Sequence, residues 1–204
     1  IPFDFISYAF MKNALIAILL ISPIFAMLGT MIVNNKMAFF SDALGHSALT
    51  GIAIGMLFGI ANVNLSMIIF AVIFAILLNM VKHKTTYGAD TIISVFSSIA
   101  IALGLALLSQ SGNITKYSSY LVGDILSITI NEIIYLLIAF IIIAIFWRKF
   151  FNKLNCVSIN ETLAKSKGIN VQLIDNIFVI LIAVIVMISI RWIGILLINS
   201  LLIL

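Results

Sequence analysis

Charged residues are scarce in this chain: they make up 9% of its 204 residues, against 64% hydrophobic residues. A soluble domain cannot bury so much apolar surface, so the composition excludes an ordinary soluble protein. Long apolar runs such as "IIYLLIAFIIIAIFW" do not alternate between polar and apolar positions, which excludes a transmembrane β-barrel. The composition therefore predicts an all-α fold, a polytopic bundle of transmembrane helices in a lipid bilayer.

Cysteine pairs and familiar catalytic motifs are also missing. A single cysteine, Cys156, excludes an intrachain disulfide, and no CxxC spacing indicates a structural zinc. The chain has no HExxH or GxSxG motif, which argues against an intramembrane enzyme. It has no GxxxxGK[ST] phosphate loop either, so any use of ATP requires another subunit. The basic residues cluster at the ends of apolar runs, so the net charge of +4 does not indicate a nucleic-acid partner.

The apolar runs divide the chain into predicted membrane spans. These cover residues 13–33, 37–60, 65–81, 91–109, 132–147 and 173–190, and a further run starts at Trp192. Residues 120–130 ("YLVGDILSITI") are too few to span and too apolar for an ordinary loop, so we expect a re-entrant or interfacial piece. Residues 1–204 are predicted to form one transmembrane domain. Because the chain begins at Ile1 and ends inside an apolar run, we expect the natural protein to continue beyond it, above all at the C-terminus.

The basic residues orient these spans. One group falls in loops assigned to the same side of the membrane: Lys36, Lys82, Lys84, Arg148, Lys149, Lys153, Lys165 and Lys167. The remaining basic residues fall on the other side: Lys12, Lys116 and Arg191. Cytoplasmic loops are enriched in Lys and Arg, so the larger group is predicted to be cytoplasmic and the N-terminus to lie outside. His83, among the lysines of a cytoplasmic loop, is expected to be solvated.

The second predicted span carries polar side chains in the stretch "FFSDALGHSALTGIAIG". Asp42, His46 and Thr50 follow at intervals of four, which predicts one shared helix face. A carboxylate at membrane depth costs about 2.5–3.5 kcal/mol, so we expect the face to meet protein or water, with Thr50 as a possible pathway residue. Carboxylate oxygen and imidazole nitrogen are ligands that Mn²⁺, Fe²⁺ and Zn²⁺ accept. Asp42 and His46 are therefore candidates for a transient site on the route of a divalent metal ion.

Two side chains are too few ligands for any of these ions. If two copies of the chain surround a central pathway, the set becomes two carboxylates and two imidazoles. Two other roles stay open: a structural hydrogen bond between Asp42 and His46, and a proton relay through the same pair. Asp124, in the short segment 120–130, is a weaker candidate for the pathway.

A stripe of small residues runs beside the polar face, again every four residues: Ser47, Gly51, Gly55 and Gly59. Small side chains at this spacing let two helix backbones approach closely. The stripe therefore predicts a helix-packing face. The chain also has one substantial hydrophilic segment, about residues 155–172, which composition alone permits to be either a solvated loop or a docking surface for a soluble partner.

Several of these stretches resemble the signatures of one family. "MAFFSDALGHSALTGIAIG" resembles the second-span signature of the permease subunits of metal-type ABC importers, which take up zinc, manganese or iron. Further stretches are similar to later signatures of that family, in the family's order: "ADTIISVFSSIAIALGLALLS", "YLVGDIL", "NETLAKSKGINVQLID" and "RWIGILLINSLLIL". Two positions depart from the pattern, because the family often has Gly where Ser41 stands and Pro where Thr50 stands. The loss of Pro removes an expected irregularity of the helix near His46.

The resemblance implies a type II-like permease that forms a homodimer, binds cytoplasmic ABC ATPase subunits and receives its substrate from an extracellular metal-binding protein. It implies a multi-pass protein of the bacterial cytoplasmic membrane with no permanently bound cofactor and a divalent metal ion as substrate. The ATPase contact is expected at Glu161, Ala164 and Gly168. Two alternatives remain: an ABC permease for a chelate of the siderophore or cobalamin type, and a secondary ion- or proton-coupled transporter.

Overall fold

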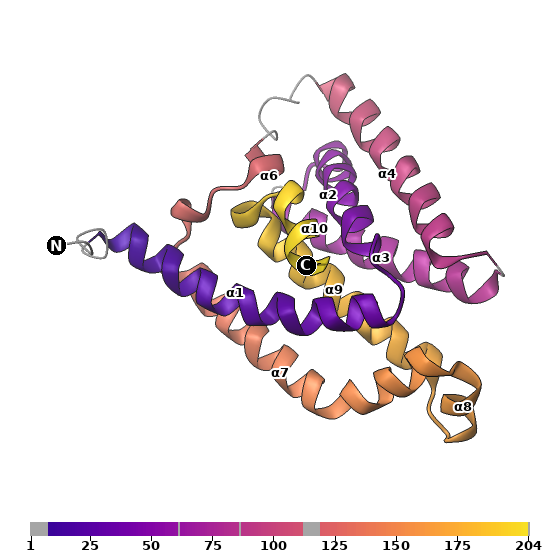
Figure 1. Cartoon of the computed structure of the whole chain (residues 1–204). Helices are drawn as coiled ribbons and strands as arrows, with labels where there is room; N and C mark the ends of the chain where they lie inside the picture. The colour runs from indigo at the N-terminus through magenta and orange to yellow at the C-terminus, as the bar shows by residue number, and fades with distance from the viewer. Residues whose placement is uncertain (1–7, 61, 86, 112–118, 204) are drawn as a thin grey trace.

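The computed structural model describes residues 8–60, 62–85, 87–111 and 119–203. Lys116, one of the basic residues assigned to the outside, lies outside the described residues. The described residues form helices and no strand, which confirms the predicted all-α membrane bundle (Figure 1). The elements are α1 (Ala9–Asn34), α2 (Phe40–Leu57), α3 (Val63–Lys84), α4 (Ala89–Ser111), α6 (Ser119–Val122), the short 3₁₀ helix η2 (Ile125–Ser127), α7 (Ile130–Ile159), α8 (Glu161–Ser166), α9 (Val171–Ile193) and α10 (Ile195–Ile203).

Five of the described helices are long and apolar enough to cross a membrane: α1, α3, α4, α7 and α9. Each contains 22 to 30 residues over that stretch, and about 20 helical residues cover a hydrocarbon core of ~30 Å. Large apolar side chains remain exposed along them, such as Ile138, Ile141 and Ile145 on α7. Such a surface suits contact with lipid, where exposed apolar side chains carry no penalty.

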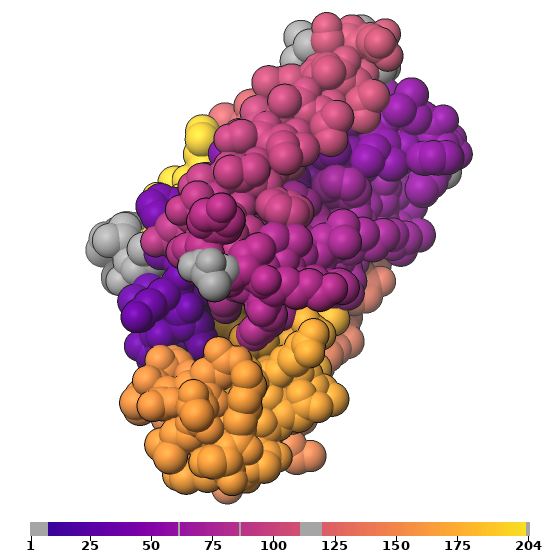
Figure 2. Space-filling model, turned by 90° about the vertical axis from the view of Figure 1, so that its right-hand side faces the viewer, coloured from indigo at the N-terminus to yellow at the C-terminus, as the bar shows by residue number. Residues whose placement is uncertain are grey.

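The predicted second span departs from this group. The sequence predicts a span over residues 37–60, whereas α2 is a shorter helix of 18 residues from Phe40 to Leu57. It packs against α3, α4, α9 and α10, and most of its residues are buried (Figure 1). Figure 2 shows α4 running along the outside of the molecule beside α2 and α3. A helix enclosed by other helices can carry polar side chains that a lipid-facing helix cannot, because protein groups surround them.

The ends of the helices gather at two ends of the bundle. Lys36, Lys82 and Glu161 line one cavity of about 380 Å³, so the ends of α1 and α3 lie beside α8. The start of α7 and the end of α9 meet elsewhere, where Arg191 Nη1 lies 2.7 Å from Glu132 Oε1. This grouping agrees with the alternation that the basic residues predict. The last turns of α7, together with the whole of α8, form a lobe that extends beyond the other helices (Figures 1 and 2).

The short segment 120–130 folds as α6 and η2 with Gly123 between them. Gly123 (φ +75°) lies against Gly194 (φ +84°), the residue that separates α9 from α10. A Cβ atom on either glycine would run into the backbone of the other segment. The amide of Asp124 also donates to the carbonyl of Arg191, at 3.2 Å. Protein therefore packs on this irregular backbone at Gly123 and Asp124, whereas the Val122 and Leu126 side chains stay exposed; the depth of the segment in the membrane stays a prediction.

Candidate functional site

Asp42 and His46 lie on one face of α2, as their spacing predicts. The helix begins at Phe40, later than the predicted span, so Asp42 lies in its first turn. The unpaired amides of a first turn stabilise a carboxylate by about 0.3–1 kcal/mol. His46 follows one turn later, with Nε2 at 3.5 Å from Oδ1 of Asp42. The side chains are 39% and 29% exposed, so both reach the surface of the single chain.

Asn199 of α10 joins this pair, although no motif or spacing in the sequence pointed to it. Its Nδ2 donates to Oδ1 of Asp42 at 3.4 Å. Its Oδ1 accepts a hydrogen bond of 2.8 Å from the hydroxyl of Ser41. Asn199 and Asp42 are 157 residues apart in the chain. The available signal was an amide side chain inside the apolar run "ILLINSLLI", where a polar group needs a partner.

The cluster offers oxygen and nitrogen donors but no complete metal site. Asp42 supplies carboxylate oxygens and His46 an imidazole nitrogen. Within the described ranges, no group of three or more His, Cys, Asp and Glu side chains is placed to hold a metal ion. Metal sites built by proteins use four or more ligands. The described residues of one copy therefore offer a cation at most partial coordination.

Thr50 does not lie on the exposed face of Asp42 and His46, which corrects the prediction that the three residues share one face. It is fully buried, and its hydroxyl donates to the carbonyl of Ala100 on α4. A Cβ atom at Gly104 would lie only 2.8 Å from the Thr50 hydroxyl oxygen, so the two helices touch here. Intervals of four drift by about 40° each around a helix of 3.6 residues per turn. The drift turns Thr50 away from Asp42 into a packing contact, and its suggested place in the pathway is not supported.

The structure buries Ser47 and places the next two small residues of the second stripe, Gly51 and Gly55, against α3. Ser47 is fully buried, and a Cβ atom at Gly51 would lie 3.1 Å from Cα of Met67. A Cβ atom at Gly55 would collide with the side chain of Ser66, whose hydroxyl donates to the carbonyl of Gly51. Small side chains are therefore required where α2 and α3 approach each other.

Gly59 has a different role from the packing role that the stripe predicts. It follows the end of α2 with φ +67°, and among the described residues no heavy atom lies within 4 Å of a Cβ built on it. Its amide donates to the carbonyl of Met56 at 3.1 Å, and the amide of Ile60 donates to the carbonyl of Gly55 at 2.8 Å. These two hydrogen bonds form a Schellman motif, in which glycine adopts the left-handed conformation that ends a helix.

Asp124 has a local structural role in the short segment. Its Oδ1 accepts a hydrogen bond of 3.1 Å from the amide of Leu126 and caps η2. Together with Tyr120, Ser127 and Arg191, it lines a cavity of about 220 Å³. Among the described residues, Asp124 makes no contact with Asp42, His46 or Asn199. The geometry therefore does not support a place for Asp124 in the pathway, which stays a prediction.

The hydrophilic segment folds into α8, whose charged face is exposed. Nζ of Lys165 lies 2.8 Å from Oε1 of Glu161, and this hydrogen bond holds the pKa of Glu161 below its ordinary value. Gly168 ends the helix with φ +72°, and the next amide, of Ile169, donates to the carbonyl of Ala164. Ala164 is fully buried, so it anchors α8 to the chain. This corrects its predicted role as a residue in direct contact with an ATPase.

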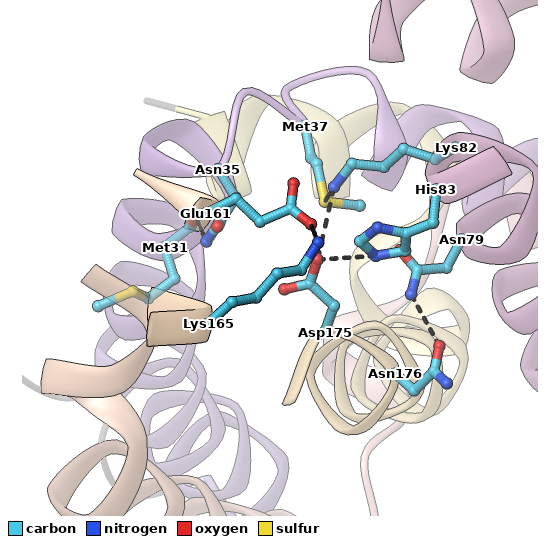
Figure 3. A network of polar contacts seen from close by, with 10 residues as sticks. All are labelled: Met31, Asn35, Met37, Asn79, Lys82, His83, Glu161, Lys165, Asp175 and Asn176. Atoms are coloured by element: carbon cyan, nitrogen blue, oxygen red, sulfur yellow. Dashed lines mark hydrogen bonds and ion pairs between the residues drawn. The ribbon is translucent and has the colours of Figure 1, made fainter. Parts of the chain in front are cut away.

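A buried charge cluster lies beside α8 (Figure 3). Asp175, near the start of α9, is 6% exposed. Its Oδ2 lies 3.1 Å from Nε2 of His83 and 3.9 Å from Nζ of Lys82, both in the last turn of α3. The His83 side chain is only 18% exposed, so the expectation that it is solvated is wrong. Nearby, Asn79 donates to Asn176 at 2.7 Å, so charge and amide contacts join α3 to α9.

The sequence matches the ABC 3 transport family over residues 7–204. The "High-affinity zinc uptake system membrane protein ZnuB" of Haemophilus influenzae is 32% identical over 191 residues, which cover 93% of this chain and 73% of that protein. The "Manganese transport system membrane protein MntC" of Listeria monocytogenes is 26% identical, over 96% of this chain and 70% of its own length.

The fold has a counterpart among solved structures. A chain of PsaBC from Streptococcus pneumoniae in complex with Fab has a TM-score of 0.79 and 26% sequence identity, and the match covers 98% of this chain and 72% of that chain. These similarities confirm the resemblance that the sequence motifs indicate. The chain therefore belongs to the ABC 3 transport family, as a helical permease subunit in a membrane.

Proposed function

We propose that this chain is the permease of an ATP-driven importer of divalent metal ions, with Zn²⁺ and Mn²⁺ as the first candidates and Fe²⁺ as the third. The observation that carries the proposal is the pair Asp42 and His46, held 3.5 Å apart on α2 with both side chains partly exposed. The similarity to relatives named for zinc uptake and manganese transport supports it.

Asp42 and His46 would form a transient station for the ion. A carboxylate oxygen and an imidazole nitrogen suit all three candidate ions, so the pair does not choose between them. Conduction needs a site that binds well enough to admit the ion and weakly enough to release it. Partial coordination by a few ligands meets this need, whereas a closed site with four protein ligands would trap the ion.

The working unit in this proposal is a homodimer. Two copies facing each other across a common pathway double the donor set to two carboxylates and two imidazoles. That number suffices for tetrahedral Zn²⁺ and, with water, for the larger coordination shells of Mn²⁺ and Fe²⁺. The exposed side chains of Asp42 and His46 leave room for such a partner.

The energy for transport would come from a separate cytoplasmic ATPase, since the sequence has no phosphate-loop motif of its own. The exposed face of α8 around Glu161, together with the exposed Gly168 after it, offers a contact surface for that subunit. Asn160 caps the start of α8 through a hydrogen bond of 3.0 Å to the amide of Leu163. A short, capped helix anchored by Ala164 can pass on a movement of the ATPase as a rigid body.

The membrane in this proposal is the bacterial cytoplasmic membrane. An extracellular metal-binding protein would deliver the ion at the end of the bundle opposite α8, where Glu132 pairs with Arg191. No resident cofactor is required, because the metal ion is the substrate.

The experiment that tests the proposal is uptake of Zn²⁺, Mn²⁺ and Fe²⁺ by proteoliposomes that contain the full permease with its ATPase. We expect ATP-dependent uptake of at least one of the three ions. The double variant Asp42→Ala/His46→Ala should lose that uptake while the protein still inserts into the membrane. Unchanged uptake by the double variant would remove the pair from the mechanism.

Two other outcomes would favour the alternatives. Uptake of a metal chelate but not of the free ion would indicate a permease of the chelate type. Uptake that needs a proton gradient and proceeds without ATP would indicate a secondary transporter. Stimulation of the ATPase activity, measured ion by ion, then identifies the preferred metal.

A further inference from the structure

We propose that Asn199 is a positioning residue for Asp42: its amide group, held in place by Ser41, fixes the carboxylate that receives the metal ion. This inference rests on the proposed function, because it assigns a role within the same site. Asn199 is neither acidic nor a histidine, and the role concerns its hydrogen bonds and not metal ligation.

The orientation of the Asn199 amide follows from its two neighbours. An ionised carboxylate only accepts hydrogen bonds, so Asn199 must turn its NH₂ group toward Asp42. The contact from Nδ2 to Oδ1 of Asp42 is 3.4 Å. The amide oxygen then faces Ser41, whose hydroxyl donates to it at 2.8 Å. Ser41 thus satisfies the amide oxygen in the orientation in which Asn199 donates to Asp42.

The helix that carries Asn199 is fixed on both sides. A Cβ atom at Gly45 of α2 would lie 2.9 Å from Cγ2 of Ile195, so α10 touches α2 directly. On the other side, a Cβ atom at Gly29 of α1 would collide with the backbone of Leu202. Because α10 is held between α1 and α2, the Asn199 amide can act as a rigid support for Asp42 and not as a mobile surface group.

This support has a consequence for ion binding. Oδ1 of Asp42 has two polar neighbours, Asn199 and His46, the latter at 3.5 Å. Without the amide, the carboxylate could turn fully toward the imidazole, and the two ligands would satisfy each other. A hydrogen-bond partner that holds a metal ligand in orientation typically contributes about 10–100-fold to metal affinity. Asn199 should therefore lower the concentration of metal ion needed for transport.

A merely structural contact between α2 and α10 would have a different signature. Loss of such a contact lowers the amount of folded protein or its melting temperature, but the folded fraction binds the ion as before. A positioning role changes the half-saturating metal concentration of the folded complex and leaves the maximal rate nearly the same. The two roles are therefore separated by measuring both parameters on intact complexes.

The experiment measures metal uptake against metal concentration in proteoliposomes containing the full permease–ATPase complex. We expect Asn199→Leu to raise the half-saturating metal concentration about 10–100-fold. The maximal rate of uptake should stay within about twofold of wild type, because Asn199 acts on ion binding alone. Ser41→Ala should shift it in the same direction by a smaller factor. Asn79→Leu is the matched control, because it removes another amide contact between helices, to Asn176, and should leave the half-saturating concentration unchanged.

The results separate the positioning role of Asn199 from general destabilisation and from failure of the proposed function. A wild-type half-saturating concentration in Asn199→Leu overturns the positioning role and leaves the proposed function standing. An equal shift in Asn79→Leu overturns it as well, because the effect would then be one of general destabilisation. Should Asn199→Leu fail to insert, Ser41→Ala and Asn199→Ala replace it with the same criterion. A wild-type complex that transports none of the ions overturns the proposed function and this inference together.

Discussion

Nε2 of His83 lies 3.1 Å from Oδ2 of Asp175, so a side-chain contact joins the last turn of α3 to the start of α9. Nζ of Lys82 adds a positive group 3.9 Å from the same oxygen (Figure 3). α3 packs on α2, which carries Asp42 and His46, while α9 follows directly after α8. The contact therefore links α9, the helix that follows α8, to α3, which packs on the helix of the candidate site.

Replacement of Asp175 should destabilise the protein measurably. Asp175→Ala leaves the largely buried Lys82 and His83 without their carboxylate, and an unpaired buried polar or charged group costs about 1–3 kcal/mol. We expect a lower melting temperature of the detergent-solubilised complex. A melting temperature equal to that of wild type would show that water already satisfies these groups.

The matched control for that prediction is Glu161→Gln. Glu161 also pairs with a lysine, but its side chain is 48% exposed and that of Lys165 is 64% exposed. Exposed ion pairs contribute about 0–1 kcal/mol, because water screens them. We therefore expect almost no change in melting temperature.

The carboxyl group of Glu161 should titrate below its ordinary pKa of 4.5, chiefly because Lys165 donates a hydrogen bond to it. Its pKa is lower in the folded protein than in the unfolded chain, so its small stabilising contribution is present above pH 4.5 and is lost as the pH falls through the folded value. Carbon-13 labelling of glutamate makes the carboxyl groups of Glu132 and Glu161 visible. The Glu132→Gln variant removes the Glu132 signal and so assigns the Glu161 signal. The Lys165→Met variant should then raise the pKa of Glu161.

Two glycines with similar backbone conformations should respond differently to alanine. Gly194→Ala and Gly59→Ala both place a side chain at positive φ, which costs about 1–2 kcal/mol. Only at Gly194 does the new Cβ also meet backbone, that of Val122 and Gly123, which adds about 1–3 kcal/mol of overpacking. We expect the larger drop in melting temperature for Gly194→Ala. Equal drops would mean that α6 moves aside without cost.

Thr50→Val tests whether Thr50 packs helices or belongs to the pathway. Valine has nearly the same shape but lacks the hydroxyl that donates to Ala100, so we expect a loss of about 1 kcal/mol in stability. The half-saturating metal concentration for uptake should stay at the wild-type value, because Thr50 is buried away from Asp42. An increase in that concentration would return Thr50 to the site.

The sequence by itself determined the features that depend on neighbours along the chain. Apolar runs of span length are local, and so the membrane class and the five long helices followed from composition and length. The shared face of Asp42 and His46 also followed, because a four-residue interval places two side chains together on any α-helix. The motif order was equally readable, and it led to the family.

Tertiary structure decided which polar groups meet across helices. Asn199 reaches Asp42, His83 reaches Asp175 and Thr50 reaches Ala100 only after the helices pack, and hydropathy carries no information about such pairs. The extent of α2 was likewise decided by its surroundings, because enclosure by other helices permits a shorter and more polar helix than lipid does. Helix geometry is a local property of the chain, whereas side-chain partnership depends on how α2, α3, α9 and α10 are arranged in space.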